Sequence, residues 1–315
     1  MEVTRRLFFK LTGTLAATSL IPGSKTVWAA EAAEGSKNAY GCLVDTTLCV
    51  GCRKCEQACN ERHVLPKPRE SFEEMTVLEN ERRMDETTYT VINKYYPKNI
   101  GSLTWRNRPT FVKFQCMHCM DPSCVSACIV GALTKQPNGA VTYDAKKCIG
   151  CRYCMVACPF QVPAYEYDNP LTPQVRKCTF CFQDIKDGGL PACAQTCPKE
   201  AITFGKRADL LSLAAWKMKS HPGKYVDHLY GEHEIGGTSW LYLASEPFES
   251  IGFPKLGTTA PPRLTEAIQH GMFQNFAAPI GLYVVLGGIM WVTGFLKNNH
   301  GKKAQNDPVD KGDSP

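Results

Sequence analysis

Apolar residues are concentrated near the two ends of the chain. A mildly apolar run covers residues 11–21, and residues 271–296 form an uncharged run of 26 residues. At about 1.5 Å per residue, a helix of that length extends about 39 Å, which exceeds the roughly 30 Å hydrocarbon core of a bilayer. The second run therefore predicts a transmembrane helix over 271–296. A helix buried in a protein core is the alternative.

Between these runs the pattern predicts short elements joined by loops. Apolar and polar residues alternate as in short strands over 87–93, 140–144, 201–204 and 240–244. Residues 210–218 predict one helix with Trp216 on its apolar side. The charged segment 72–83 predicts a solvated helix or loop. The mixture indicates a loop-rich α+β fold.

The first 29 residues have the layout of an export signal. Arg5 and Arg6 precede the apolar run, Pro22 and Gly23 end it, and small residues follow near Ala29. Adjacent arginines ahead of such a run are typical of a twin-arginine signal peptide. An amphipathic first helix with a chance arginine pair is the alternative. Because this route exports folded proteins, it suits a chain that loads metal before export.

The residues around 271–296 predict its orientation. Lys297, Lys302 and Lys303 follow the run, so the positive-inside rule places a tail of residues 297–315 in the cytoplasm. The body then lies on the periplasmic face of the bacterial inner membrane, with a single-pass C-terminal anchor. Small residues such as Gly281 and Gly288 allow close packing against other membrane helices.

Composition and charge exclude two classes of protein. The hydrophobic content of 43% is too high for wholesale disorder. The formal net charge is +6, of which +3 falls in residues 1–29 and +1 in residues 297–315, which leaves +2 for the rest. Nucleic-acid-binding proteins usually carry a concentrated basic face. We therefore expect no nucleic-acid partner.

Sixteen of the 17 cysteines fall into four groups. Group one is Cys49, Cys52, Cys55 and Cys59; group two is Cys116, Cys119, Cys124 and Cys128; group three is Cys148, Cys151, Cys154 and Cys158; group four is Cys178, Cys181, Cys193 and Cys197. Groups one and three have the Cys-x2-Cys-x2-Cys-x3-Cys spacing of bacterial ferredoxins. Three thiolates on one loop can hold three irons of a [4Fe–4S] cluster, and the fourth cysteine points away to the other cluster of a pair.

Two other uses of sixteen thiols remain as alternatives. Four structural zinc sites are possible, although zinc sites usually pair two Cys-x2-Cys hooks, and groups one and three do not have that form. Eight disulfides are possible in an oxidising compartment, but loading before export removes the need for them. Cys42 is the odd cysteine, and we interpret it as a buried or incidental thiol rather than a ligand.

The loops of groups two and three resemble a known family. Cys116 to Cys124 and Cys148 to Pro159 resemble the four-cluster ferredoxin-type subunits of membrane-bound oxidoreductases such as formate dehydrogenase, dimethyl sulfoxide reductase and hydrogenase 2. The resemblance covers about residues 43–205, and Ile129 stands where the family often has Pro. It implies a tandem bacterial-ferredoxin-like domain over residues 40–205, with an insertion at 60–115 and four [4Fe–4S] clusters.

The resemblance also implies which cysteines share a cluster. In that family groups one and four pair, as do groups two and three. The implied ligands are Cys49, Cys52, Cys55 and Cys197 for cluster 1; Cys178, Cys181, Cys193 and Cys59 for cluster 2; Cys116, Cys119, Cys124 and Cys158 for cluster 3; and Cys148, Cys151, Cys154 and Cys128 for cluster 4.

Within the family, the whole chain is most similar to the HybA-type subunits of hydrogenase 2. The features outside the cysteine groups are the export signal, the segment 228–238, and residues 268–270 before the apolar run. Residues 206–270 would then extend toward the membrane. This resemblance implies an electron-transfer subunit that is not catalytic alone. It would relay electrons from the small and large subunits of a [NiFe] hydrogenase to a multi-pass, quinone-reducing membrane subunit.

Two further function hypotheses stay open. The same subunit could serve a molybdenum enzyme of the formate dehydrogenase or polysulfide or sulfoxide reductase type, or the chain could be an exported, zinc-stabilised interaction module. Two histidines are candidate auxiliary residues. His118 could donate a hydrogen bond to a cluster sulfur or be a solvated loop residue, and His270 could face a quinone site or anchor the chain at the membrane interface.

Overall fold

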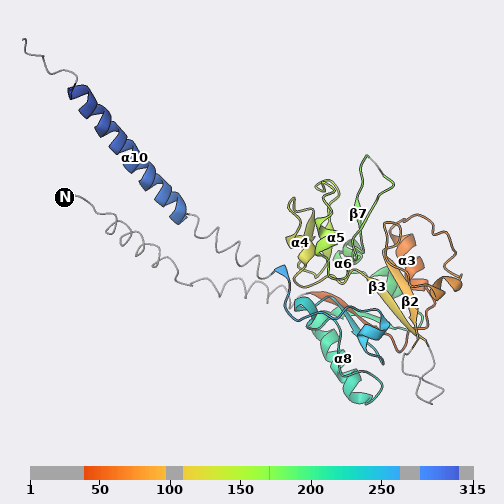
Figure 1. The fold of residues 1–315 in the computed structure, drawn as a ribbon. Coiled ribbons are helices and arrows are strands. Elements are labelled where there is room, and N and C mark those ends of the chain that lie inside the picture. The colour runs from red at the N-terminus through yellow and green to blue at the C-terminus, as the bar shows by residue number, and fades with distance from the viewer. Residues whose placement is uncertain (1–38, 97–108, 170, 263–276, 305–315) are drawn as a thin grey trace, which may run out of the picture. The chain divides into compact units, whose positions relative to one another are not determined.

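The computed structural model describes residues 39–96, 109–169, 171–262 and 277–304. Figure 1 shows short helices and strands joined by long loops in the part that carries the cysteines. The predicted signal over 1–29, with Arg5 and Arg6, lies outside the described residues, as do His270 and the end of the predicted tail. The chain divides into two units, and the second contains residues 23–263.

The central element is a three-stranded sheet with the order β8-β1-β9. Strand β1 (Tyr40–Asp45) pairs antiparallel with β8 (Ile202–Lys206) and parallel with β9 (Trp240–Leu243). All of β9 is buried, and so is most of β1, because other elements cover both strands. The parallel pairing of β9 makes residues beyond 206 part of the same folded body as the cysteine groups.

The helix α8 (Arg207–Ser220) covers the sheet on one side. Leu210 and Ala214, one helical turn apart, pack against Leu43 and Leu241. The prediction of a helix over 210–218 is therefore confirmed. The expected position of Trp216 is wrong: its side chain is 60% exposed, because the buried stripe of α8 follows Leu210 and Ala214 instead.

The predicted strands are found, with shifted ends. The segment 87–93 corresponds to β2 (Thr90–Tyr95), which forms a hairpin with β3 (Thr110–Gln115). The segments 140–144, 201–204 and 240–244 correspond to β5 (Val141–Tyr143), β8 and β9, and β5 pairs with β4 (Leu133–Lys135). A further two-stranded sheet joins β6 (Ala164–Tyr165) to β7 (Val175–Arg176). The charged segment 72–83 is a loop that contains the 3-10 helix η1 (Thr76–Glu79).

Short helices lie at each cysteine group. They are α3 (Lys54–Arg62) in group one, α4 (Ser123–Ser126) in group two, α5 (Tyr153–Ala157) in group three, and α6 (Phe182–Lys186) and α7 (Ala192–Gln195) in group four. Each contains a cysteine of its group except α6, which directly follows Cys181. Two more 3-10 helices, η3 (Glu234–Gly236) and η4 (Phe248–Ile251), lie beyond α8. Helix α3 packs against α7, and α4 packs against α5. This packing joins cysteine groups that are distant in sequence.

The C-terminal helix α10 (Ala277–Ala304) belongs to the other unit and is described by itself. The predicted transmembrane helix began at residue 271, and residues 271–276 lie outside the described residues. α10 continues past the predicted end at Leu296 as far as Ala304. Among the helices in the described parts of the chain, none is long and apolar enough to cross a membrane. The predicted span is therefore not shown by the structure.

Candidate electron-transfer site

The first two cysteines of every group form a hook with one shared backbone feature. The residue just before the second cysteine has a positive φ in all four hooks: Gly51 (71°), His118 (47°), Gly150 (70°) and Phe180 (62°). This left-handed turn folds the chain back, so that amide N–H groups approach the first sulfur. The amides of Gly150 and Phe180 each donate to the Sγ of the preceding cysteine at 3.4 Å. Such hydrogen bonds favour the thiolate form that binds metal.

Two of the four hooks use residues that resist this conformation. A left-handed φ is strained for side chains as large as those of His118 and Phe180. Both side chains are almost completely buried, and their rings lie 4.9 Å apart between centroids. Their mutual packing holds the strained turns of group two and group four against each other. In the other two hooks a glycine indicates the left-handed turn in the sequence. No glycine indicates this turn at His118 or Phe180.

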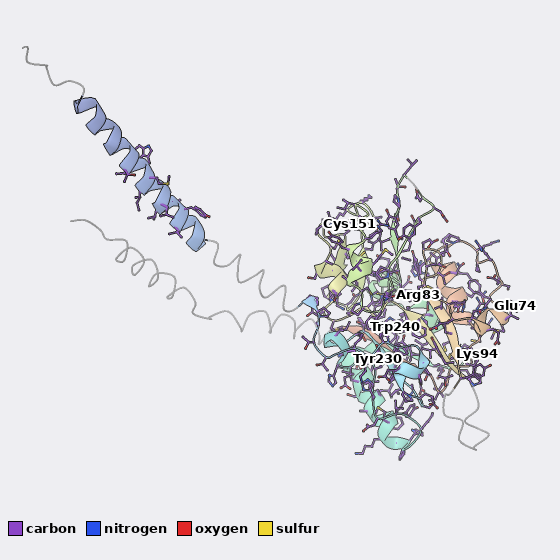
Figure 2. All side chains as sticks on the ribbon, viewed as in Figure 1. Glu74, Arg83, Lys94, Cys151, Tyr230 and Trp240 are labelled. Carbon is purple, nitrogen blue, oxygen red and sulfur yellow. The ribbon has the colours of Figure 1, made fainter. Side chains whose placement is uncertain are left out.

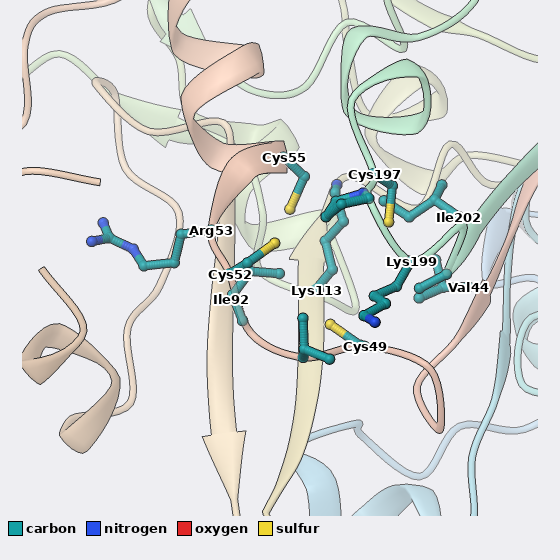
Figure 3. Close-up of a pocket in the computed structure, with 13 residues that line it drawn as sticks. Val44, Cys49, Cys52, Arg53, Cys55, Ile92, Lys113, Cys197, Lys199 and Ile202 are labelled. Atoms are coloured by element: carbon teal, nitrogen blue, oxygen red, sulfur yellow. The ribbon is translucent and has the colours of Figure 1, made fainter. Parts of the chain in front are cut away.

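The structure brings Cys197 of group four to the hook of group one. Cys49, Cys52, Cys55 and Cys197 line one pocket together with Lys113, and Figure 3 shows their sulfur atoms turned toward a shared space. Helix α3 supplies Cys55, and Cys197 directly follows Thr196 at the end of α7. We call these four residues set one.

A second set forms where α3 meets the hook of group four. Burial raises the pKa of the Cys59 thiol, and the neighbouring thiols of Cys178, Cys193 and Cys181 raise it further. Cys59 lies one helical turn beyond Cys55 on the same face of α3, so the two side chains are displaced by about 6 Å along the helix axis and can join different sets. We call Cys59, Cys178, Cys181 and Cys193 set two.

The same arrangement recurs between groups two and three. Besides burial, the thiols that raise the pKa of Cys119 are those of Cys116, Cys158 and Cys124, which form set three. Burial and the thiols of Cys148, Cys128 and Cys151 raise the pKa of Cys154 to about 11. We call these four cysteines set four. We group the thiols as the resemblance implies for clusters 1 to 4, although neighbouring sets also influence each other, since Cys154 of set four raises the pKa of Cys124 of set three. Ligation of a cluster by each set stays a prediction.

The chemistry of these thiols suits a bound iron centre. Burial raises the pKa of Cys49 and Cys181 to about 11 and that of Cys124 and Cys178 to about 12. Buried thiolates are stable only where positive charge compensates them, and iron ions supply such charge. In the described ranges, no three His, Cys, Asp or Glu side chains are close enough to hold a single metal ion.

Cys42 lies on β1, away from the four groups in sequence. It is fully buried, and Cys193 and Cys178 are among the groups that, after burial itself, raise its pKa. The expectation that it is a buried thiol is therefore confirmed. His118 is also fully buried, which rules out the alternative of a solvated loop residue. Its Nδ1 accepts a hydrogen bond from the amide of Val141 at 2.9 Å, so the proton of the neutral ring lies on Nε2.

Comparison with known proteins is consistent with this geometry. The 4Fe-4S dicluster domain family matches residues 108–207. The chain is 36% identical to the hydrogenase-2 operon protein HybA of Escherichia coli O157:H7 over 287 residues, which cover 82% of this chain and 86% of that protein. The chain belongs to the HybA family of iron–sulfur subunits.

Two other relatives are also similar to most of this chain. The nitrate-inducible formate dehydrogenase iron–sulfur subunit of Escherichia coli K12 is 33% identical over 68% of this chain and 71% of its own length. A protein of Nitratidesulfovibrio vulgaris is 48% identical over 83% of this chain and 70% of its own length. The predicted family is confirmed. Like other HybA-family subunits, the chain is an iron–sulfur electron-transfer subunit of an oxidoreductase and is not catalytic alone.

Proposed function

We propose that the chain holds four [4Fe–4S] clusters, one in each set of cysteines, and passes electrons along them between a catalytic subunit and a membrane subunit. The observation that carries the proposal is the pocket in which Cys197 of group four meets Cys49, Cys52 and Cys55 of group one, and the packing of α3 on α7 and of α4 on α5 brings the paired groups together in the same way. Bound clusters supply one-electron carriers. The protein's part is to position the thiols, to exclude water from them and to surround them with compensating charge.

One edge of the body suits electron exchange with a partner. Cys151 of set four is exposed, and three large apolar side chains flank it in sequence, those of Ile149, Tyr153 and Val156, each more than half exposed. Ile129, next to Cys128 of the same set, is 70% exposed. Figure 2 shows Cys151 near the periphery and Trp240 in the interior. Exposed apolar patches on soluble domains often mark interaction sites. Electrons therefore enter or leave the chain at set four.

The catalytic partner we propose is a [NiFe] hydrogenase, with its small and large subunits, and the electron acceptor is a multi-pass membrane subunit that reduces quinone. Support comes from the HybA relative, which matches over 86% of its length. The formate dehydrogenase relative supports a molybdenum enzyme as the second candidate. In either case this chain connects the catalytic subunit to the membrane.

The location we propose is the periplasmic face of the inner membrane. The arginine pair and apolar run in residues 1–29 support export by the twin-arginine route, and the uncharged run 271–296 supports attachment at the membrane. In the part of that run whose side chains are described, those of Leu282, Val285, Met290 and Trp291 are among the exposed apolar ones. Exposed apolar side chains on a helix favour contact with lipid or with another membrane protein.

Metal analysis of the purified full chain tests the cluster content. Four [4Fe–4S] clusters correspond to about 16 iron and about 16 acid-labile sulfide per chain. Zinc in place of iron and sulfide would support the interaction module instead. A content near eight would mean that two of the four sets are empty.

Analysis of the assembled complex tests the partner. The tagged chain is purified from the membranes of its host with its subunits attached, and nickel and molybdenum are measured. Nickel together with hydrogen-dependent quinone reduction supports the hydrogenase. Molybdenum together with formate-dependent quinone reduction supports the second candidate and refutes the first.

A further inference from the structure

Lys113 places a charged group in the interior of the body, beside set one. It belongs to β3, and only 2% of its surface is exposed. Its side chain lines the same pocket as the four thiols of set one (Figure 3). Its Nζ donates to Oε1 of Gln115 at 2.8 Å and lies 4.5 Å from the ring centroid of Trp240. These contacts hold the ammonium group in one position.

Within the described residues, no carboxylate neutralises this ammonium group. Other lysines of the body have acidic partners: Lys217 contacts Asp45, and Lys94 contacts Glu79. Among the described residues, no Asp or Glu forms an ion pair with Lys113. A buried charge without a counter-ion is unstable by several kcal/mol, so buried charges are paired in folded proteins. An anion must therefore complete this site.

The groups that surround Lys113 are the thiols of sets one and two. Burial is the largest single influence on its pKa and lowers it, but Cys193, Cys55, Tyr242 and Cys178 all act in the opposite direction, and the net effect is a raised pKa. In turn, Lys113 lowers the pKa of thiols from both sets, which are Cys49 and Cys55 of set one and Cys59, Cys178 and Cys181 of set two. The ammonium group therefore favours the thiolate form of cysteines in both sets.

Two other interior lysines, the partly buried Lys135 and the buried Lys177, use more of their N–H donors on backbone carbonyls than Lys113 does. Lys135 donates to three backbone carbonyls, those of His118, Cys119 and Gly139. Lys177 donates to the carbonyls of Val141 and Cys178. An ammonium group has three N–H donors. Lys113 uses one of them on Gln115 within the described residues, and the others stay available for sulfur.

We propose that Lys113 is the shared counter-charge of the two clusters held by sets one and two, and that it raises their reduction potentials. The inference rests on the proposed function. Reduction adds one electron from the neighbouring carrier and no proton, so a cluster gains one negative charge. A fixed positive charge inside the protein stabilises that reduced form more than the oxidised form. Lys113 influences electron transfer only through the charge that it places beside the clusters, and it takes no part in the transfer itself.

Redox titration of the full chain, monitored by electron paramagnetic resonance with dithionite as reductant, tests the proposal. Lys113→Met and Lys113→Gln remove the charge, Lys113→Arg keeps it, and Lys94→Met removes a lysine from the neighbouring strand β2 as a matched control. We expect both neutral variants to lower the equilibrium constant for reducing at least one cluster of sets one and two by tenfold or more. For a one-electron couple, that shift is about 59 mV. Lys113→Arg and Lys94→Met should leave all potentials near those of the wild type.

Each outcome decides the proposal. Neutral variants that keep their iron and show unshifted potentials refute it. If the neutral variants lose the iron of sets one and two while Lys113→Arg keeps it, the charge is needed for assembly and the proposal stands. If Lys113→Arg loses the iron as well, the shape of the side chain matters rather than its charge, and the proposal is wrong. Wild-type protein without iron would refute the proposed function instead, before any variant is compared.

Discussion

Glu56 is the buried carboxylate that connects the cluster-bearing helix α3 to the inserted hairpin. It lies between Cys55 and Cys59, and its side chain is 1% exposed. Its Oε2 accepts from Nε of Arg53 at 3.0 Å, its Oε1 accepts from the amide of Ile92 at 2.6 Å, and Arg82 contacts both oxygens. One side chain therefore neutralises two arginines and satisfies an amide of β2.

Glu56→Gln keeps the size of the side chain and removes its charge. The Arg53 and Arg82 guanidinium groups then face each other without an anion, and Arg53 is almost fully buried. Removing one partner of a buried ion pair costs about 3–5 kcal/mol. Because α3 contains Cys55 of set one and Cys59 of set two, we expect the variant to release iron from these sets first.

Loss of the visible absorbance of the clusters during urea denaturation measures the effect. With a denaturant slope of up to about 3 kcal/mol/M, a cost of about 3 kcal/mol lowers the midpoint by about 1 M or more. Glu79→Gln is the matched control, since Glu79 is 62% exposed and pairs with Lys94 at the surface. An exposed pair contributes less than about 1 kcal/mol. Equal midpoints for Glu56→Gln and Glu79→Gln would refute the reasoning.

Three further predictions test the ligand sets and the two ends of the chain. Cys128→Ser should damage the cluster of set four and spare that of set three, as assigned paramagnetic resonance signals would show; loss confined to set three would contradict the pairing. Arg5→Lys combined with Arg6→Lys keeps the charge but should leave the loaded protein in the cytoplasm by cell fractionation, because the export route recognises the arginines themselves; export of the double variant would rule out a twin-arginine signal. Gly288→Leu adds bulk where, apart from the adjoining residues and backbone of α10, no atom of the described residues lies within 4 Å of an added Cβ. The variant should keep its iron and its hydrogen oxidation with a soluble acceptor but lose quinone reduction, since bulk prevents close helix packing; unchanged quinone reduction would mean that no partner helix packs against this residue.

The spacing of the cysteines by itself determined the chemistry of this protein. Residues two or three apart along a chain share one loop or helical turn, so Cys49, Cys52 and Cys55 are held close together by covalent geometry alone. The strands β2, β5, β8 and β9 and the helix α8 also followed from local alternation and periodicity, whereas β1, β3, β4, β6 and β7 were not predicted. These features could be predicted because their physical causes lie within a few residues of each other.

The tertiary structure decided what joins distant segments. Cys197 reaches the hook of group one because α7 packs on α3, and without the family resemblance no local pattern predicts that contact. Nothing in the sequence distinguishes Glu56 and Lys113 from the other charged residues of the chain. Their burial, and so the strength of their electrostatic effects, depends on the elements that exclude water around them. The exposure of Trp216 has the same origin, because the sheet that α8 covers selects which of its faces is buried.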